Sequence, residues 1–87
     1  MMDYIDGEWK DPRIVPNAPM SIEPANLTLH YGQAVFEGLK AFRHPDDSIC
    51  TYRPDKHYAR LCRSCQHLCI PEPPVDVVMR GQKQLIS

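Results

Sequence analysis

Three cysteines follow one another at the spacing CxxCxxxC, with two histidines nearby in the sequence: Cys62, Cys65 and Cys69, then His57 and His67. Thiolates and imidazoles at short spacing can bind zinc or take part in thiol redox chemistry. A tetrahedral zinc site normally takes its second pair of ligands from another segment, and no second CxxC or suitably spaced histidine pair occurs. The three thiols also share one helical face with two leucines. This pattern favours packing in a core, with a thiol or zinc module as the alternative.

Lys40 is a second candidate, because it lies among glycines, aromatics and small apolar residues in the stretch LHYGQAVFEGLKAF. An amine in a dry pocket can have a lowered pKa and attack a carbonyl cofactor. If residues 36–42 form a strand, Phe36, Gly38, Lys40 and Phe42 share one face. A lysine at a strand margin is usually solvated, which is the favoured interpretation here. Gly38 is more informative, since a glycine inside a strand often marks the close approach of a ligand or backbone.

Arginines on the polar side of a helix could bind phosphate, because a guanidinium matches phosphate oxygens in a bidentate manner. Arg60 and Arg63 occupy such positions, but no glycine-rich phosphate loop precedes them. The four histidines form no recognisable catalytic triad. Residue types and spacing alone therefore favour ordinary structural roles for these side chains and indicate only a small α+β module.

Composition limits the classes of function. The 87 residues are 43% hydrophobic and 24% charged, which is typical of a small globular domain. The net charge of -1 argues against nucleic acid or an anionic membrane as a partner. The first residues lack the features of a secretory signal or transit peptide, and no stretch approaches the 18 apolar residues of a membrane span. We therefore expect a cytoplasmic chain with reduced thiols.

The elements that would position these residues belong to an α+β fold with an antiparallel sheet and two helices. Asp-Gly in residues 3–10 predicts a tight hairpin, and four prolines in residues 11–28 predict an extended connection. The sequence predicts a second antiparallel hairpin from residue 37 to 53, around the turn HPDDS. One helix is predicted from the PD pair at 54–55 to residue 68, and another begins near residue 75. No helix-terminating signal follows Ile86, so we expect the architecture to continue further.

Two stretches in this order carry a resemblance to a known family: LHYGQAVFEGLKAFR and YRPDKHYARLCRSCQHLCIP. They resemble the N-terminal region of branched-chain amino acid aminotransferases, and the resemblance spans most of the chain. It implies that residues 1–87 are part of the N-terminal small domain of a class IV, fold-type IV, pyridoxal-phosphate (PLP) enzyme, without the C-terminal cofactor domain. Members of this family are homodimers in amino-acid metabolism. They move the amino group of leucine, isoleucine or valine to 2-oxoglutarate in a ping-pong reaction.

The resemblance also implies roles for individual residues. Tyr31, Phe36 and Gly38 match residues that form the substrate pocket, and Arg60 matches the arginine that binds the phosphate of PLP. The family's Schiff-base lysine lies in the C-terminal domain, whereas Lys40 matches a lysine of the small-domain strand. We therefore expect no catalytic residue in this chain and no activity from the chain alone.

Other interpretations remain beside this one. D-amino acid transaminases and aminodeoxychorismate lyases are also class IV enzymes, although the HYG, FEGLKAF and RPD segments favour the branched-chain group. A truncated, non-catalytic chain could instead serve as a dimerisation module.

Overall fold

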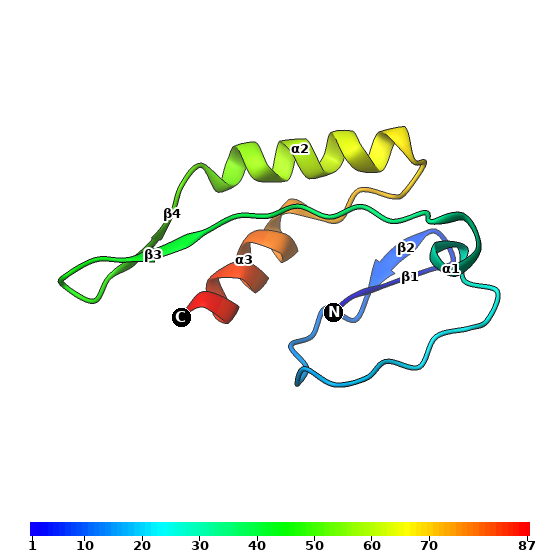
Figure 1. The fold of residues 1–87 in the computed structure, drawn as a ribbon, viewed down its shortest axis with the longest axis horizontal. Helices are drawn as coiled ribbons and strands as arrows, with labels where there is room; N and C mark the ends of the chain where they lie inside the picture. Colours follow the sequence, from blue (N-terminus) through cyan, green and yellow to red (C-terminus); the bar gives the residue numbers. More distant parts are fainter.

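The computed structural model describes all residues, 1–87, as a mixed α+β chain (Figure 1). The predicted α+β class and antiparallel pairing are confirmed. The single predicted sheet is wrong, because the strands form two separate two-stranded sheets, and a short third helix is also present. The elements are β1 (Asp3–Ile5), β2 (Glu8–Lys10), α1 (Leu27–Tyr31), β3 (Ala41–Arg43), β4 (Ile49–Thr51), α2 (Pro54–His67) and α3 (Val75–Ile86).

The first hairpin forms as the Asp-Gly pair predicts. Asp6 and Gly7 connect β1 to β2 with φ angles of 52° and 81°, and such positive angles at both central positions are those of a type I′ turn. Tyr4 and Trp9 are paired across the strands with their ring centroids 5.2 Å apart. The Trp9 indole N–H donates to the Glu72 carbonyl at 2.7 Å. This bond joins the hairpin to the segment that precedes α3.

The helix α1 begins in the last two residues of the stretch 11–28 that was predicted to be extended. Asn26 begins it, since its side-chain oxygen accepts the Thr28 N–H at 2.9 Å. Gly32 ends it with a φ of 62°, a left-handed conformation in which a glycine costs least. The prediction of an extended chain over residues 11–28 is therefore wrong at Leu27 and Thr28. An N-cap asparagine six residues before a glycine, with no proline between, was the available signal.

The second hairpin is shorter than predicted. β3 begins at Ala41 rather than at residue 37, because β4 supplies partners only for Ala41–Arg43. The turn is closed by the His44 N–H, which donates to the Ser48 carbonyl at 2.8 Å. Residues 36–40 run extended without a partner strand, so the predicted strand face shared by Phe36, Gly38, Lys40 and Phe42 does not exist.

The helix α2 begins at Pro54, as predicted, with Asp55 in its first turn. It ends in a Schellman motif, in which the Ile70 N–H donates to the Cys65 carbonyl at 2.9 Å. Cys69 takes the left-handed position of this motif, with a φ of 54°. Its thiol is exposed, so the prediction that it packs in the core is wrong, whereas Cys62 and Cys65 are buried as predicted. The motif turns the chain toward α3.

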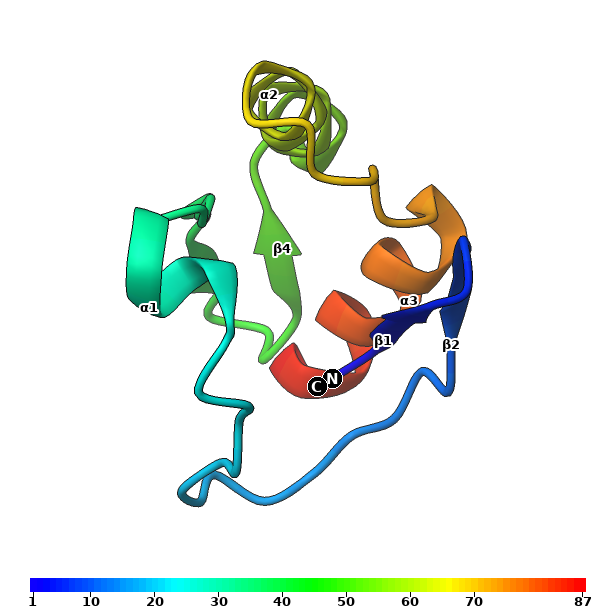
Figure 2. The ribbon, with the colours of Figure 1, turned by 90° about the vertical axis from the view of Figure 1, so that its right-hand side faces the viewer.

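Little of the chain is buried. Cys62 and Cys65 are the only two buried residues of 87. The accessible surface is 7213 Å², whereas a compact protein of 10.0 kDa exposes about 5,200 Å². The radius of gyration is 14.9 Å, against about 12 Å for a compact chain of this length. The three helices are spread apart, with α1 and α3 on opposite sides in Figure 2. None of the helices is long and apolar enough to cross a membrane.

Substitution of Gly32 and Gly81 tests the backbone conformations at these two positions, left-handed at Gly32 and helical at Gly81. Gly32→Ala should lower the free energy of unfolding by about 1 to 2 kcal/mol, because alanine is strained in the left-handed region. Gly81→Ala should raise it by up to about 1 kcal/mol, since Gly81 is helical and an added Cβ would meet no atom within 4 Å. Urea unfolding of the full chain, followed by circular dichroism, measures both. An equal decrease in the free energy of unfolding in both variants would contradict these two backbone conformations.

Candidate functional site

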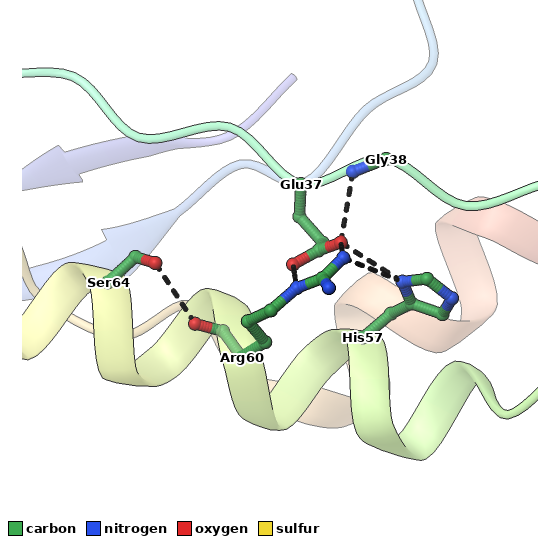
Figure 3. A network of polar contacts seen from close by, with 5 residues as sticks. All are labelled: Glu37, Gly38, His57, Arg60 and Ser64. Carbon is green, nitrogen blue, oxygen red and sulfur yellow. Dashed lines mark hydrogen bonds and ion pairs between the residues drawn. The ribbon is translucent and has the colours of Figure 1, made fainter.

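A network of polar contacts joins α2 to the unpaired segment before β3 (Figure 3). We call it the Glu37 network, and its members are Glu37, Gly38, His57 and Arg60. His57 and Arg60 lie three residues apart on α2, so their side chains project from the same face of the helix. In Figure 3 both point toward Glu37, which reaches down from the segment above the helix. The network therefore connects residues that are 20 or 23 positions apart.

The carboxylate of Glu37 is contacted by all three other members of the network. The Arg60 Nε donates to Oε2 at 2.6 Å, and Arg60 Nη2 donates to Oε1. His57 Nδ1 lies 3.0 Å from Oε1, and the Gly38 N–H donates to the same oxygen at 3.1 Å. The Glu37 side chain is only 10% exposed, whereas that of Arg60 is 59% exposed. One edge of the Arg60 guanidinium is therefore fixed, while the remainder of that side chain faces solvent.

The donors keep Glu37 ionised. The hydrogen bond from Arg60, followed by that from His57, lowers the pKa of Glu37 from 4.5 to about 2. The same bond with Glu37 raises the pKa of Arg60. The pair therefore carries opposite charges throughout the physiological range.

A hollow of about 350 Å³ opens beside this network at the start of α2. Its lining contains three cationic side chains, one histidine and one tyrosine: Arg53, Lys56, Arg60, His57 and Tyr52. Arg53 is held by Asp55, which accepts from its Nε at 3.1 Å and from its Nη2 at 3.0 Å. Lys56 forms no ion pair. This donor set, rich in positive charge and partly unpaired, fits a phosphate or carboxylate group.

The structure places the predicted site residues in two groups. Gly38 and Arg60 meet through the carboxylate of Glu37. Tyr31 and Phe36 are 83% and 94% exposed, so they form no pocket within this chain. A Cβ added to Gly38 would meet no atom within 4 Å, which means that packing inside the chain does not require a glycine there.

Sequence reasoning missed Glu37 and His57. The spacing of His57 and Arg60 on one helix face was an available signal, but nothing in the sequence connected that face to Glu37. Lys40 is exposed, in agreement with the expectation that it is solvated.

The thiols form no metal site in the structure. No group of three or more His, Cys, Asp or Glu side chains is arranged to hold a metal ion, and all four cysteines are free. Burial raises the pKa of the Cys65 thiol. A hydrogen bond with Cys62, together with burial, raises the pKa of Tyr58 to about 12, and its hydroxyl donates to the Pro73 carbonyl at 2.8 Å. These groups hold α2 against the segment before α3.

The lowered pKa of Glu37 predicts how stability depends on pH. A carboxylate whose pKa is lower in the folded chain than in the unfolded chain stabilises the fold fully at a pH above the unfolded pKa. This stabilisation is lost as the pH falls and the carboxylate of the folded chain becomes protonated. The loss should extend from pH 4.5 toward about 2. In Glu37→Gln, the melting temperature should therefore decrease less steeply than in the wild type as the pH falls through this range. Glu8→Gln, which changes an exposed glutamate outside the network, serves as the control. If the melting temperature of Glu37→Gln depends on pH as steeply as that of the wild type, the pKa of Glu37 is not lowered in the folded chain.

Comparison with known proteins finds relatives along the whole chain, although no family model matches it. It is 48% identical over 88 residues to the branched-chain-amino-acid aminotransferase 2 of Bacillus subtilis (strain 168), covering 100% of this chain and 24% of the relative. It is 47% identical over 79 residues to a probable branched-chain-amino-acid aminotransferase of Streptomyces coelicolor, covering 91% of this chain and 22% of that protein. The chain thus spans about a quarter of the length of these relatives. Identity at this level confirms the resemblance found in the sequence: the chain is homologous to the branched-chain amino acid aminotransferases.

Proposed function

We propose that this chain contributes the phosphate anchor and part of the substrate wall of a PLP-dependent branched-chain aminotransferase. The enzyme would move the amino group of leucine, isoleucine or valine to 2-oxoglutarate. The observation that carries this proposal is the guanidinium of Arg60, which lies on a cationic hollow in a chain homologous to such enzymes. Its relatives' names favour this activity over that of a D-amino acid transaminase or an aminodeoxychorismate lyase.

Arg60 is the proposed partner of the phosphate group. Its outer edge is exposed, and Lys56 lines the same hollow without an ion pair of its own. Charge-assisted hydrogen bonds to a phosphate dianion are about twice as strong as neutral ones, so this donor set suits the anchoring of a phosphate monoester. PLP, when bound, supplies the electron sink that the reaction at the amino acid's Cα requires.

Tyr31, Phe36 and Gly38 are the proposed substrate wall. The two aromatic side chains are exposed here and so remain available to cover an apolar substrate. Burying a leucine-sized side chain contributes about 1.5 to 3 kcal/mol to binding. The absence of a Cβ at Gly38 leaves the backbone there open to close approach by the substrate.

Lys40 has no proposed part in the chemistry. It is exposed and lies in none of the polar contacts of the Glu37 network. A catalytic amine needs desolvation or a cationic neighbour to lower its pKa, and an exposed lysine lacks the first of these. We therefore expect no transamination from these 87 residues alone.

Binding of PLP to the full 87-residue chain tests the anchor. Arg60→Ala should weaken binding about tenfold or more, because charge-assisted hydrogen bonds to the phosphate are lost. Arg63→Ala removes an equal charge from the same exposed helix and is the matched control. Fluorescence titration with PLP, and with pyridoxal that lacks the phosphate, measures the difference. Equal effects of the two arginine variants, or a change in PLP absorption that is lost in Lys40→Ala, would contradict the proposal.

A second candidate function, a dimerisation module formed with another copy of the chain, is favoured by the exposed surface. The surface exceeds that of a compact protein by about 2,000 Å². A standard interface buries about 800 Å² on each partner, so one copy could cover much of this excess. Phe36, at 94% exposed, is the most exposed of the large apolar side chains.

Sedimentation of the chain over a range of concentrations tests this second candidate. The wild type should form dimers, and Phe36→Ser should shift the equilibrium toward monomer because it removes exposed apolar area with little effect on folding. Lys40→Ser, at an exposed polar position of the same segment, is the control. A wild-type chain that stays monomeric at every concentration would exclude the dimerisation module.

A further inference from the structure

We propose that Glu37 is a positioning residue that fixes the guanidinium of Arg60 so that its outer edge is presented to a phosphate. The inference rests on the proposed role of Arg60 as the phosphate anchor. Glu37 itself would not touch the phosphate, because its carboxylate occupies a different edge of the guanidinium, the one formed by Nε and Nη2.

The geometry of the guanidinium carries this inference. An arginine has five N–H donors in one plane, arranged so that two different edges can each bind an oxyanion in a bidentate manner. Glu37 occupies the edge formed by Nε and Nη2. Nη2 also lies 3.5 Å from Nδ1 of His57, whereas Nη1 forms no hydrogen bond within the chain. The edge formed by Nη1 and Nη2 therefore keeps the N–H donors of Nη1 for another anion. One guanidinium can therefore hold both groups at once.

Glu37 is held firmly enough to act in this way. Its Oε1 accepts the N–H of Gly38 at 3.1 Å and lies 3.0 Å from Nδ1 of His57. Its side chain is 10% exposed, so few conformations are open to it. A glutamate that was free in solvent could not orient an arginine, because both side chains would move together.

Two effects of Glu37 on anion binding oppose each other, and this makes the inference testable. As a negative charge, Glu37 repels a phosphate, so its removal should strengthen binding. As a positioning residue, it removes rotamer freedom from a long side chain before the phosphate arrives, so its removal should weaken binding. Arg60 is 59% exposed, so this repulsion acts largely through water, and the high dielectric constant of water weakens it. We therefore expect positioning to dominate at physiological ionic strength.

The experiment uses NMR to measure the affinity of the full chain for inorganic phosphate, and compares four variants with the wild type. Glu37→Ala should weaken binding about two- to tenfold, the range for freeing one flexible side chain. Glu37→Gln should weaken it less, because the amide oxygen can still accept one N–H of Arg60. Asp76→Ala removes the same charge from α3, outside the network, and should leave the affinity unchanged. Arg60→Ala should remove most of the binding.

Each outcome has a distinct meaning. Phosphate binding by Glu37→Ala that is as tight as or tighter than in the wild type would overturn the positioning role. If Arg60→Ala also binds like the wild type, the phosphate anchor fails with it. If only Arg60→Ala weakens binding, the anchor stands and the positioning role alone is wrong. A second readout is the Arg60 Nε–H signal, which should exchange slowly with water in the wild type and rapidly in Glu37→Ala.

Loss of folding is recognised by the circular dichroism of the helices. Should Glu37→Ala lose that signal, Glu37→Gln decides the result. Weaker binding by Glu37→Gln that persists at about 0.5 M salt supports positioning, since charge effects are screened there within about 4 to 5 Å. Unchanged or tighter binding by that variant overturns it.

Discussion

The ion pair between Glu37 and Arg60 is the contact on which the arrangement of this chain depends. It ties the unpaired segment 36–40 to α2, across 23 positions of sequence, where no strand pairing does so. With two residues buried, apolar packing alone cannot fix how the elements lie. Individual hydrogen bonds and ion pairs between residues far apart in the sequence help to fix how the elements lie. The bond from Gln33 Nε2 to the Leu68 carbonyl, at 2.7 Å, joins the chain just before this segment to the end of α2.

This way of holding a chain together has a consequence for its apolar side chains. Where polar bonds set the arrangement, large hydrophobic residues need not enter a core, and many remain at the surface, as Tyr31, Phe36 and Tyr52 do. Exposed apolar area of this extent is typical of surfaces that contact another protein or a ligand. The same feature therefore supports both candidate functions, since a substrate wall and a dimer interface each require uncovered aromatic side chains.

Much of the fold was predictable, and the failures have two causes. Turn chemistry is local, so Asp-Gly and HPDDS predicted both hairpins correctly, and Pro54 with Asp55 predicted the start of α2. The strand predicted from residue 37 failed because a strand needs a partner, and β4 is only three residues long. The prediction for Cys69 failed at a helix terminus, where the Schellman geometry overrides the helical period. The strand error thus depended on another segment, whereas the Cys69 error was local to the end of a helix.

The residues of the candidate site also differ in whether the sequence could indicate them. Arg60 could be proposed as a phosphate partner from the sequence, because the resemblance matches it to an arginine with that role. Glu37 and His57 could not, since their importance depends on which side chain each one meets after folding. An arginine that an acidic partner holds in place differs from one that is merely exposed: only the first presents a defined edge to an incoming anion. Under this proposal, anion binding in the hollow beside α2 depends on Glu37, a residue that does not line it.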